Sequence, residues 1–321
     1  MTRDTSDAPI RVGISACLLG AEVRFDGGHK RDAFLVDVLG KYVEWVPLCP
    51  EAEAGLGTPR PSMRLVRESS GIRLVTVRDG IDVTGQLDTF ARKRVAAIDE
   101  AHLCGWVLKK DSPSCGMERV KIYDGSGPPA KQGRGLFAAR LIERFPDLPV
   151  EEEGRLADPR LRENFIERVF AYDRLTRLFS SRWTVGAVVA FHTAHKLTLM
   201  AHSPAAYRAL GQVVAGAKGA SRAAFAEDYR RRFMQALATI ATPARHVNVL
   251  QHIAGYLRGR ADAASRAEVA TAIEDYRRGL VPLIVPITLV RHFVRALDLS
   301  YLAGQTYLEP HPKELMLRNR V

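Results

Sequence analysis

The sequence has few cysteines, few lysines in its second half and no long run of uncharged apolar residues. Only four of the 321 residues are cysteine and no pair is spaced as CxxC, so a zinc ribbon or finger has no support. No stretch approaches the roughly 18 apolar residues of a membrane span. The N-terminal residues MTRDTSDAPI lack the apolar core of a secretory signal. We therefore expect a cytoplasmic protein that neither enters a membrane nor relies on disulfides.

The bulk composition is that of an ordinary globular protein. Hydrophobic residues make up 46% and charged residues 26%, which excludes a mainly disordered protein. A chain of 321 residues is longer than a single hydrophobic core usually serves. We therefore predict two domains, residues 1–155 and residues 160–321.

Positive charge is concentrated in the second half of the chain. The whole sequence carries 47 basic and 36 acidic residues, a net charge of +11, yet residues 1–159 have a net charge of −1. Residues 160–321 carry 24 basic and 12 acidic side chains, and only three of the basic ones are lysines. Arginine suits bidentate contacts to phosphate, so this half is predicted to bind a polyanion such as RNA or DNA. The alternative is a solvated helical surface. The candidate contacts include Lys196, Arg208, Arg230, Arg231, Arg232 and Arg245.

Short apolar runs alternate with helical patterns in the first half. This alternation predicts an α/β fold with a mostly parallel, Rossmann-like sheet. The expected strands cover 11–16, 42–48, 105–109 and 121–124, with a last strand in 148–160 and a hairpin in 72–83 around Asp79-Gly80. The expected helices cover 31–40, 86–102 and 135–145.

Three of the four cysteines follow expected strands. Cys17, Cys49 and Cys115 each lie at or just after the carboxyl end of a strand, whereas Cys104 precedes one. Sites in parallel sheets form beyond the carboxyl ends of the strands. We therefore expect the three thiols to converge at one sheet edge, with Cys104 at the opposite edge as a buried small side chain.

The second half is predicted to be all-α. Ser203-Pro204 and Thr242-Pro243 are typical helix starts, Ser221 is expected to cap a further helix, and Pro282 and Pro286 interrupt a later apolar stretch. The histidines in 192–202 could bind zinc, but the segment lacks the acidic partner of HExxH, so core or RNA-facing histidines are the favoured interpretation.

Several segments carry a family resemblance. SACLLG around Cys17, LCPE around Cys49, GLGTPRP and KDSPSCG around Cys115 resemble the thiouracil desulfidases of the TudS type, which are iron–sulfur proteins. Residues 160–321, with FHTAHKLTLMAHSP, RHVNVLQHIAGY and YLEPHPKELMLRN, resemble the YbgA-type domain. The two domains joined in one chain resemble the RudS type, which converts 4-thiouridine in tRNA to uridine.

The resemblance implies roles for individual residues. Cys17, Cys49 and Cys115 correspond to the three ligands of a [4Fe-4S] cluster, Glu51 to the catalytic glutamate and Ser112 to the implicated serine. Family members commonly have arginine where this chain has Asp111, so Lys109 and Lys110 are candidate basic groups in its place, with Lys110 the expected contact to RNA.

The implied chemistry is sulfur removal without net electron transfer. Three thiolates leave one iron of a cubane cluster without a protein ligand, suited to the sulfur of a thiolated base. Glu51 would act as general base toward water, or form a covalent intermediate, and Ser112 would relay a proton or donate a hydrogen bond. Two other functions stay open: a desulfidase of free thiouracil or similar small compounds, and a non-catalytic iron–sulfur sensor that binds nucleic acid.

Overall fold

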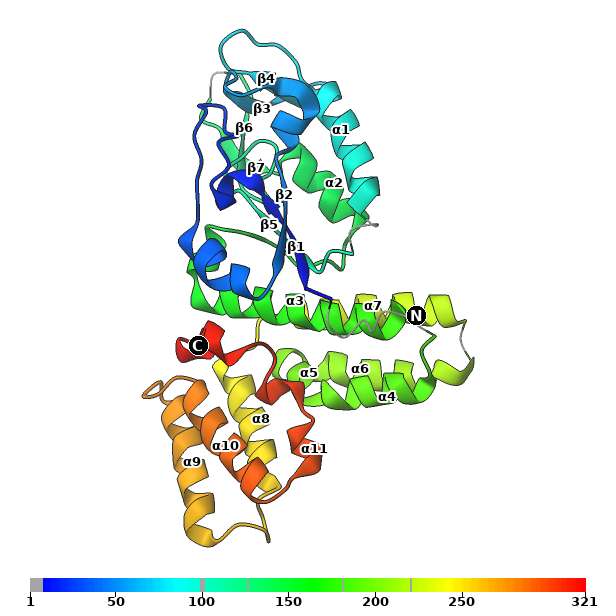
Figure 1. Ribbon diagram of the computed structural model, residues 1–321, viewed down its shortest axis with the longest axis vertical. Coiled ribbons are helices and arrows are strands. Elements are labelled where there is room, and N and C mark those ends of the chain that lie inside the picture. Colours follow the sequence, from blue (N-terminus) through cyan, green and yellow to red (C-terminus); the bar gives the residue numbers. More distant parts are fainter. Residues whose placement is uncertain (1–7, 99–101, 126, 181, 220) are drawn as a thin grey trace. The chain divides into compact units, whose positions relative to one another are not determined.

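The computed structural model describes residues 8–98, 102–125, 127–180, 182–219 and 221–321. The chain divides into two compact units, Met1–Ala157 and Asp158–Val321 (Figure 1). The first unit combines strands and helices, and the second is largely helical. The α/β plus all-α fold class predicted from the sequence is therefore confirmed.

The first unit contains a parallel sheet that positions the candidate site. Its strands are β1 (Arg11–Ser15), β2 (Glu44–Leu48), β5 (Gly105–Leu108) and β8 (Val150–Glu152), in the order β2-β1-β5-β8. Every pair in it is parallel. β1 lies in the interior of the sheet, which explains why its apolar residues are buried almost throughout. All four strands coincide with runs expected from the sequence.

A second sheet of mixed pairing was not predicted. It consists of β3 (Met63–Glu68), β4 (Gly71–Thr76), β6 (Val120–Tyr123) and β7 (Ala130–Gly133), in the order β4-β3-β6-β7. The hairpin predicted around Asp79-Gly80 is confirmed in a short form: Val75 and Asp82 form an antiparallel bridge, and Thr76 N–H donates to the Ile81 carbonyl across the turn. β3 and β4 form a second hairpin, across the turn at residues 69–70, and its register places Leu65 opposite Leu74 in the core. Asp79 and Gly80 belong to a later turn.

The helices of the first unit are α1 (Thr84–Ala97) and α2 (Leu136–Arg144), which lie side by side (Figure 1). The helix predicted for 86–102 extends beyond α1 into residues 99–101, which lie outside the described residues. The helix predicted for 31–40 is present but irregular: it consists of a π-helical turn, Phe34–Val38, followed by a 3₁₀ turn, Leu39–Lys41. A short segment that buries only Leu35 and Leu39 has little packing to hold a regular helix.

The second unit contains nine α-helices among its described residues. Ser203 and Thr242 accept capping hydrogen bonds from Ala206 and Arg245, as predicted, whereas Ser221 precedes its helix without a side-chain bond. Pro286 lies inside the first turn of a helix, where its missing N–H costs nothing. The helices are α3 (Pro159–Ser180), α4 (Val185–Ala194), α5 (Lys196–His202), α6 (Pro204–Ala215), α7 (Arg222–Ala238), α8 (Pro243–Gly255), α9 (Ala263–Arg277), α10 (Ile284–Ala296) and α11 (Ser300–Ala303).

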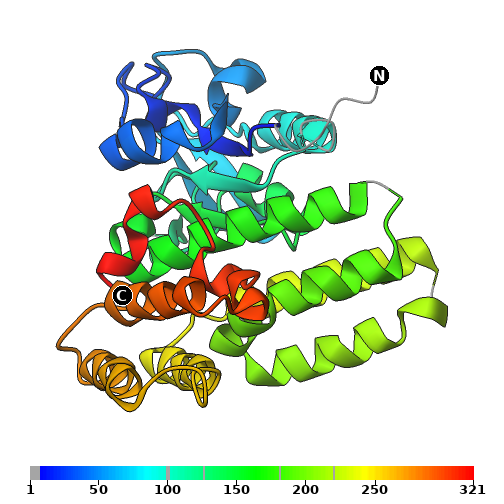
Figure 2. The same cartoon turned by 60° about the horizontal axis from the view of Figure 1, so that its bottom comes forward.

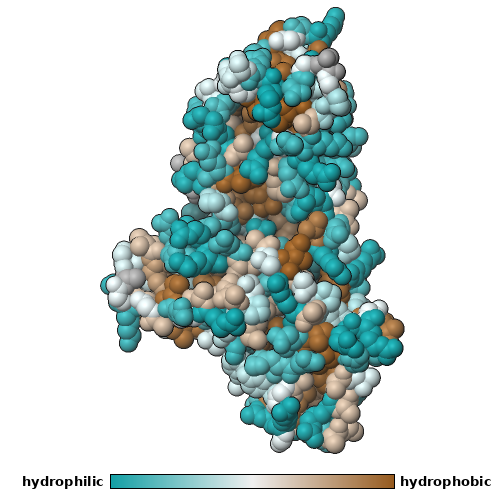
Figure 3. All heavy atoms as spheres, turned by 180° about the vertical axis from the view of Figure 1, so that it is seen from behind, coloured by the Kyte–Doolittle hydropathy of each residue, from teal (hydrophilic) through white to brown (hydrophobic). Residues whose placement is uncertain are grey.

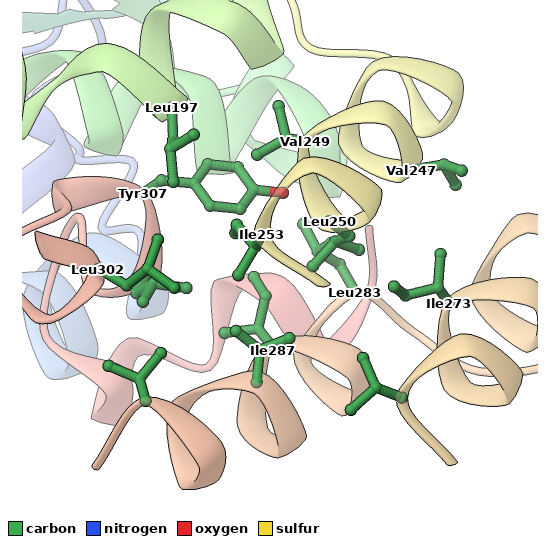
Figure 4. Packing of buried hydrophobic residues seen from close by; sticks show 14 of the residues in the cluster. Leu197, Val247, Val249, Leu250, Ile253, Ile273, Leu283, Ile287, Leu302 and Tyr307 are labelled. Atoms are coloured by element: carbon green, nitrogen blue, oxygen red, sulfur yellow. The ribbon is translucent and has the colours of Figure 1, made fainter. Parts of the chain in front are cut away.

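Two hydrophobic clusters hold the second unit together. In one, α3 packs on α7, and α6 packs on α7 and α4 (Figure 2). In the other, α8, α9 and α10 surround Leu250, Ile253 and Ile287, and the Tyr307 ring lies in the same cluster (Figure 4). The second unit therefore has a complete core of its own.

Charged groups are buried beside these clusters. Arg318 Nε donates to Glu163 Oε1 over 3.0 Å, and His202 Nε2 lies 3.1 Å from Glu167 Oε2. Burial of a charge is tolerated only when it is paired in this way. His195 and His202 are only 2% and 1% exposed, which confirms their interpretation as core histidines.

Hydrophilic side chains cover most of the face in Figure 3, and hydrophobic ones gather in small patches. In the part of the chain that the structure describes, the helices are all too short or too polar to cross a membrane.

Candidate active site

Three neighbouring strands bring three cysteines to one cavity. Cys17 lies in the 3₁₀ turn directly after β1, Cys49 follows the last residue of β2, and Cys115 lies in the loop after β5. Because β2, β1 and β5 are adjacent and parallel, their carboxyl ends meet at one edge. The three residues line a cavity of about 370 Å³. Cys104 lies at the start of β5, where its N–H donates to the Arg11 carbonyl, at the opposite edge as expected.

The three thiols share one electrostatic environment. Burial, and to a lesser extent the nearby Cys49, raise the pKa of Cys17 to about 11. Burial also raises the pKa of Cys115, as do the charges of Glu51, Cys49 and Cys17. Since each thiolate opposes the ionisation of its neighbours, a cationic centre among them would stabilise all three. An iron–sulfur cluster is bound by thiolates, and its iron ions would supply such a cationic centre.

A single metal ion fits this arrangement less well. Among the described residues, no three His, Cys, Asp or Glu side chains are close enough together to hold one ion. The ligands of a multi-iron cluster bind different irons, so they stand further apart around a larger space. Three thiols spread around one cavity therefore fit a multi-iron cluster better than a single metal ion.

The loop that carries Cys115 is fixed by its own backbone. The Ser112 hydroxyl oxygen accepts hydrogen bonds from the N–H groups of Ser114 and Cys115, at 3.2 and 3.0 Å. The start of α2 holds the loop from the other side, because Phe137 N–H donates to the Ser114 carbonyl. A side chain on Gly135 would overlap that same carbonyl group. Cys115 and Ser112 are therefore held in place before any ligand binds.

Glu51 is fixed by a buried arginine that the sequence reasoning missed. Arg60 Nε and Nη2 both donate to Glu51 Oε2, at 2.8 and 2.6 Å. The two side chains are 4% and 12% exposed, and Arg60 also donates to the carbonyls of Gly57 and Val23. Arg60 belongs to the GLGTPRP stretch, but nothing in the local pattern shows which carboxylate it meets.

Lysines approach the cavity from the β5 loop. Lys109 Nζ pairs with Glu153 Oε1 at 2.5 Å, and the Lys110 N–H donates to Glu153 Oε2 at 2.7 Å. Asp111 has a left-handed backbone and lines the same cavity. Lys110 and Asp111 therefore both face the site, while the charge of Lys109 is held by Glu153.

The arginines and lysine predicted to contact RNA are distributed over α5 to α8. Arg231 and Arg232 both pair with Asp228, and Arg245 donates to the His202 carbonyl at 2.6 Å. Lys196 differs from these, because its ammonium lies 6.0 Å from the centre of the Tyr301 ring. That ring stacks on Tyr256 with their centres 5.5 Å apart. The structure thus places one predicted cation in an aromatic cluster. Arg208 and Arg230 lie on α6 and α7.

In the first, α/β unit, three thiols and a glutamate fixed by an arginine surround one cavity. The second unit is helical and basic. The two together define a two-part protein with a thiol-lined candidate active site. Residues 12–153 match the family model of 2-thiouracil desulfurase, and residues 196–312 match DUF1722, a family of unknown function. The chain belongs to the 2-thiouracil desulfurase family through its first unit and to the DUF1722 family through its second.

Individual relatives each match about half of the chain or less. The chain is 35% identical over 161 residues to the uncharacterized protein YbgA of Escherichia coli K12, covering 50% of this chain and 95% of that one. It is 31% identical over 134 residues to the uncharacterized protein YbbK of Bacillus subtilis 168, covering 40% and 87%. Among solved structures, the [4Fe-4S]-dependent thiouracil desulfidase TudS matches with a TM-score of 0.39 and 33% identity, over 46% of this chain and 93% of that one.

Proposed function

We propose that this protein is a desulfidase that converts 4-thiouridine in tRNA to uridine and sulfide. The observation that carries the proposal is the convergence of Cys17, Cys49, Cys115 and Glu51 on one cavity in a unit of the 2-thiouracil desulfurase family. The overall reaction needs only water: its oxygen replaces sulfur at C4 of the base, and sulfur leaves as hydrogen sulfide. No electrons are transferred in this balance.

Cys17, Cys49 and Cys115 would hold a [4Fe-4S] cluster. Bound there, it would supply an iron without a protein ligand, and such an iron is a soft Lewis acid for the sulfur of the base. The buried, mutually repelling thiols support this assignment.

Glu51 would take the proton from the attacking water. Arg60 occupies Oε2 with two hydrogen bonds, whereas Oε1 accepts none from the residues that the structure describes. The arginine therefore fixes the carboxylate and leaves one oxygen for water. Arg60 is a positioning residue in this proposal, since it acts through Glu51.

Ser112 would serve as a hydrogen-bond donor toward the base. Its oxygen already accepts two backbone N–H groups, so its own proton is left for a group in the cavity. A donor fixed in advance stabilises negative charge that develops on the substrate without reorganising the site.

The second unit would hold the tRNA. Its net charge of +12 and the Lys196–Tyr301–Tyr256 cluster support this role, because nucleic-acid binding combines cations for phosphates with aromatic rings for unstacked bases. The predicted contacts Arg208, Arg230, Arg231, Arg232, Arg245 and Lys110 belong to the same proposal.

The decisive experiment compares two kinds of substrate, thiolated tRNA and free thiouracil, with the reconstituted protein. The protein is loaded with iron and sulfide under anaerobic conditions and incubated with tRNA containing 4-thiouridine, or with free 2- and 4-thiouracil. Loss of thionucleobase absorbance and release of sulfide are followed. We expect turnover of the tRNA, and a Glu51→Gln variant that keeps its iron should be inactive. Absence of sulfide release from every substrate would favour a non-catalytic iron–sulfur sensor.

Desulfidation of free thiouracil is the second candidate function. The first unit alone accounts for the match to the 2-thiouracil desulfurase model, which favours a substrate that needs no RNA-binding unit. Turnover of free thiouracil with no turnover of the tRNA would select this function.

A further inference from the structure

The second unit contains a cavity that the proposed reaction does not use. Its volume is about 440 Å³, and it lies between α3, α10 and residues 308–319. At Arg291, Leu308 and Glu309 it continues into a smaller depression of about 140 Å³, which Arg295 also lines. A cavity of this size accommodates a small organic ligand.

Cations dominate the polar lining of this cavity and its extension. Arg174, Arg291, Arg295, Lys313 and Arg318 face a single lining carboxylate, Glu309. Glu309 pairs with Arg291, and Arg318 pairs with Glu163 behind the wall. Arg174 donates to the Pro310 carbonyl at 2.5 Å, and no carboxylate of the described residues pairs with it. The cavity therefore contains positive charge that its own walls do not neutralise.

Several of these polar groups are incompletely satisfied. Arg318 Nη2 and His311 Nε2 are buried and make no hydrogen bond among the described residues, although they lie 3.7 Å from Glu167 Oε1 and 3.9 Å from Glu163 Oε1. Burial lowers the pKa of Arg174 and of Arg291, which shows that the charge of each guanidinium is poorly solvated where it lies. An anion in the cavity would relieve this cost by accepting hydrogen bonds from the guanidinium groups that line it.

One wall of the cavity is apolar. It includes Phe170, Ile284, Ile287 and Met316. Met316 is 65% exposed and has a left-handed backbone, with φ 50°. Strained residues of this kind cluster where a ligand is clamped. The matching ligand has a compact anionic group at one end and a flat apolar body at the other.

We propose that this cavity binds the phosphate ester of a nucleotide, with the phosphate at Arg174, Arg291 and Lys313 and the base against Phe170. Guanidinium groups match the geometry of phosphate oxygens, and several cations together favour a dianion over a single carboxylate. The site would exist whether or not the desulfidase proposal holds, because no residue of the first unit lines it.

Calorimetry with AMP tests the inference on the full-length protein. AMP is titrated at low salt beside adenosine and inorganic phosphate. We expect saturable 1:1 binding of AMP and at least tenfold weaker binding of either fragment. Arg291→Gln and Lys313→Ala should each weaken AMP binding by tenfold or more. Lys313 is exposed, so its truncation leaves the fold intact, and circular dichroism checks both variants.

Two control variants locate the binding. Arg258→Gln removes an exposed arginine outside the cavity, and Glu51→Gln alters the other cavity; both should bind AMP like the unmodified protein. Absence of saturable AMP binding, equal binding of adenosine, or undiminished binding by the folded Lys313→Ala and Arg291→Gln variants would overturn the proposal. Competition with a 5′-phosphorylated single-stranded RNA identifies the source: displacement of AMP indicates an RNA, and no displacement indicates a free nucleotide.

Discussion

Arg60 donates two hydrogen bonds to one oxygen of Glu51, and both side chains are almost completely buried. The pair lies beside Cys49 and lines the same cavity. Both hydrogen bonds end on Oε2, so the carboxylate is held in one orientation. This relationship gives Glu51 a fixed role before any substrate arrives.

Replacing Arg60 should separate positioning from binding. Arg60→Lys keeps the charge but loses the two-point contact, so we expect kcat for tRNA containing 4-thiouridine to fall at least tenfold, with KM nearly unchanged. Arg60→Gln should lower kcat further, toward the roughly 10²–10⁴-fold loss expected for removal of a general base. Arg64→Lys, on β3 outside the cavity, is the matched control. A large rise in KM with unchanged kcat would contradict this role.

Removal of the cavity cysteines should abolish cluster binding. Cys17→Ala, Cys49→Ala and Cys115→Ala are each expected to lose most of their iron and acid-labile sulfide after anaerobic reconstitution. Cys104→Ala should retain both, because Cys104 lies at the opposite sheet edge. Iron and sulfide are measured per chain, and visible absorbance follows the cluster. Full iron content in any of the first three variants would remove that cysteine from the ligand set.

Salt should weaken the binding of tRNA. If the second unit neutralises phosphates, log K falls linearly with log salt concentration, and loss of one phosphate contact reduces the slope by about one. Arg208→Gln should lower this slope, since Arg208 is exposed and forms no ion pair within the described residues. Arg277→Gln is the comparison, because Arg277 already pairs with Glu274. Filter-binding titrations measure both slopes. An affinity for tRNA that does not change with salt concentration would contradict binding through phosphates.

Acid should destabilise the second unit. Burial lowers the pKa of His195 and of His246 from 6.5 to about 4, so the unfolded chain binds their protons first as pH falls. Stability is therefore lost between pH 6.5 and 4, by up to on the order of 3 kcal/mol for each histidine. Glu167, whose pKa is lowered by His202 and Arg318 despite its burial, adds a further loss below its unfolded pKa of 4.5.

Denaturation followed through Trp183 measures this effect, because it is the only tryptophan of the second unit. The raised pKa of His202, caused chiefly by Glu167 against the effect of burial, acts in the other direction. Its contribution is complete below pH 6.5 and is lost only as pH rises through the folded pKa. His246→Gln should flatten the acid slope, and an unchanged slope would contradict the assignment.

Much of the first unit follows from local sequence patterns. Apolar runs near residues 11–16 and 105–109 form strands because their side chains can be buried in a parallel sheet. The position of each cysteine relative to its strand was therefore predictable, including that of Cys104. Helix starts at Ser203 and Thr242 were predictable for the same reason, since capping is a contact within one turn.

The sequence by itself thus determined which residues stand at strand ends and how charge divides between the halves. Only the tertiary structure decided that β2, β1 and β5 are neighbours, that β3 pairs with β6, and that Arg60 meets Glu51. The cationic cavity of the second unit was equally hidden, because it joins α3 and α10 to residues more than 130 positions beyond Arg174. Pairings of this kind depend on packing between distant segments, whereas periodicity and capping report only on near neighbours.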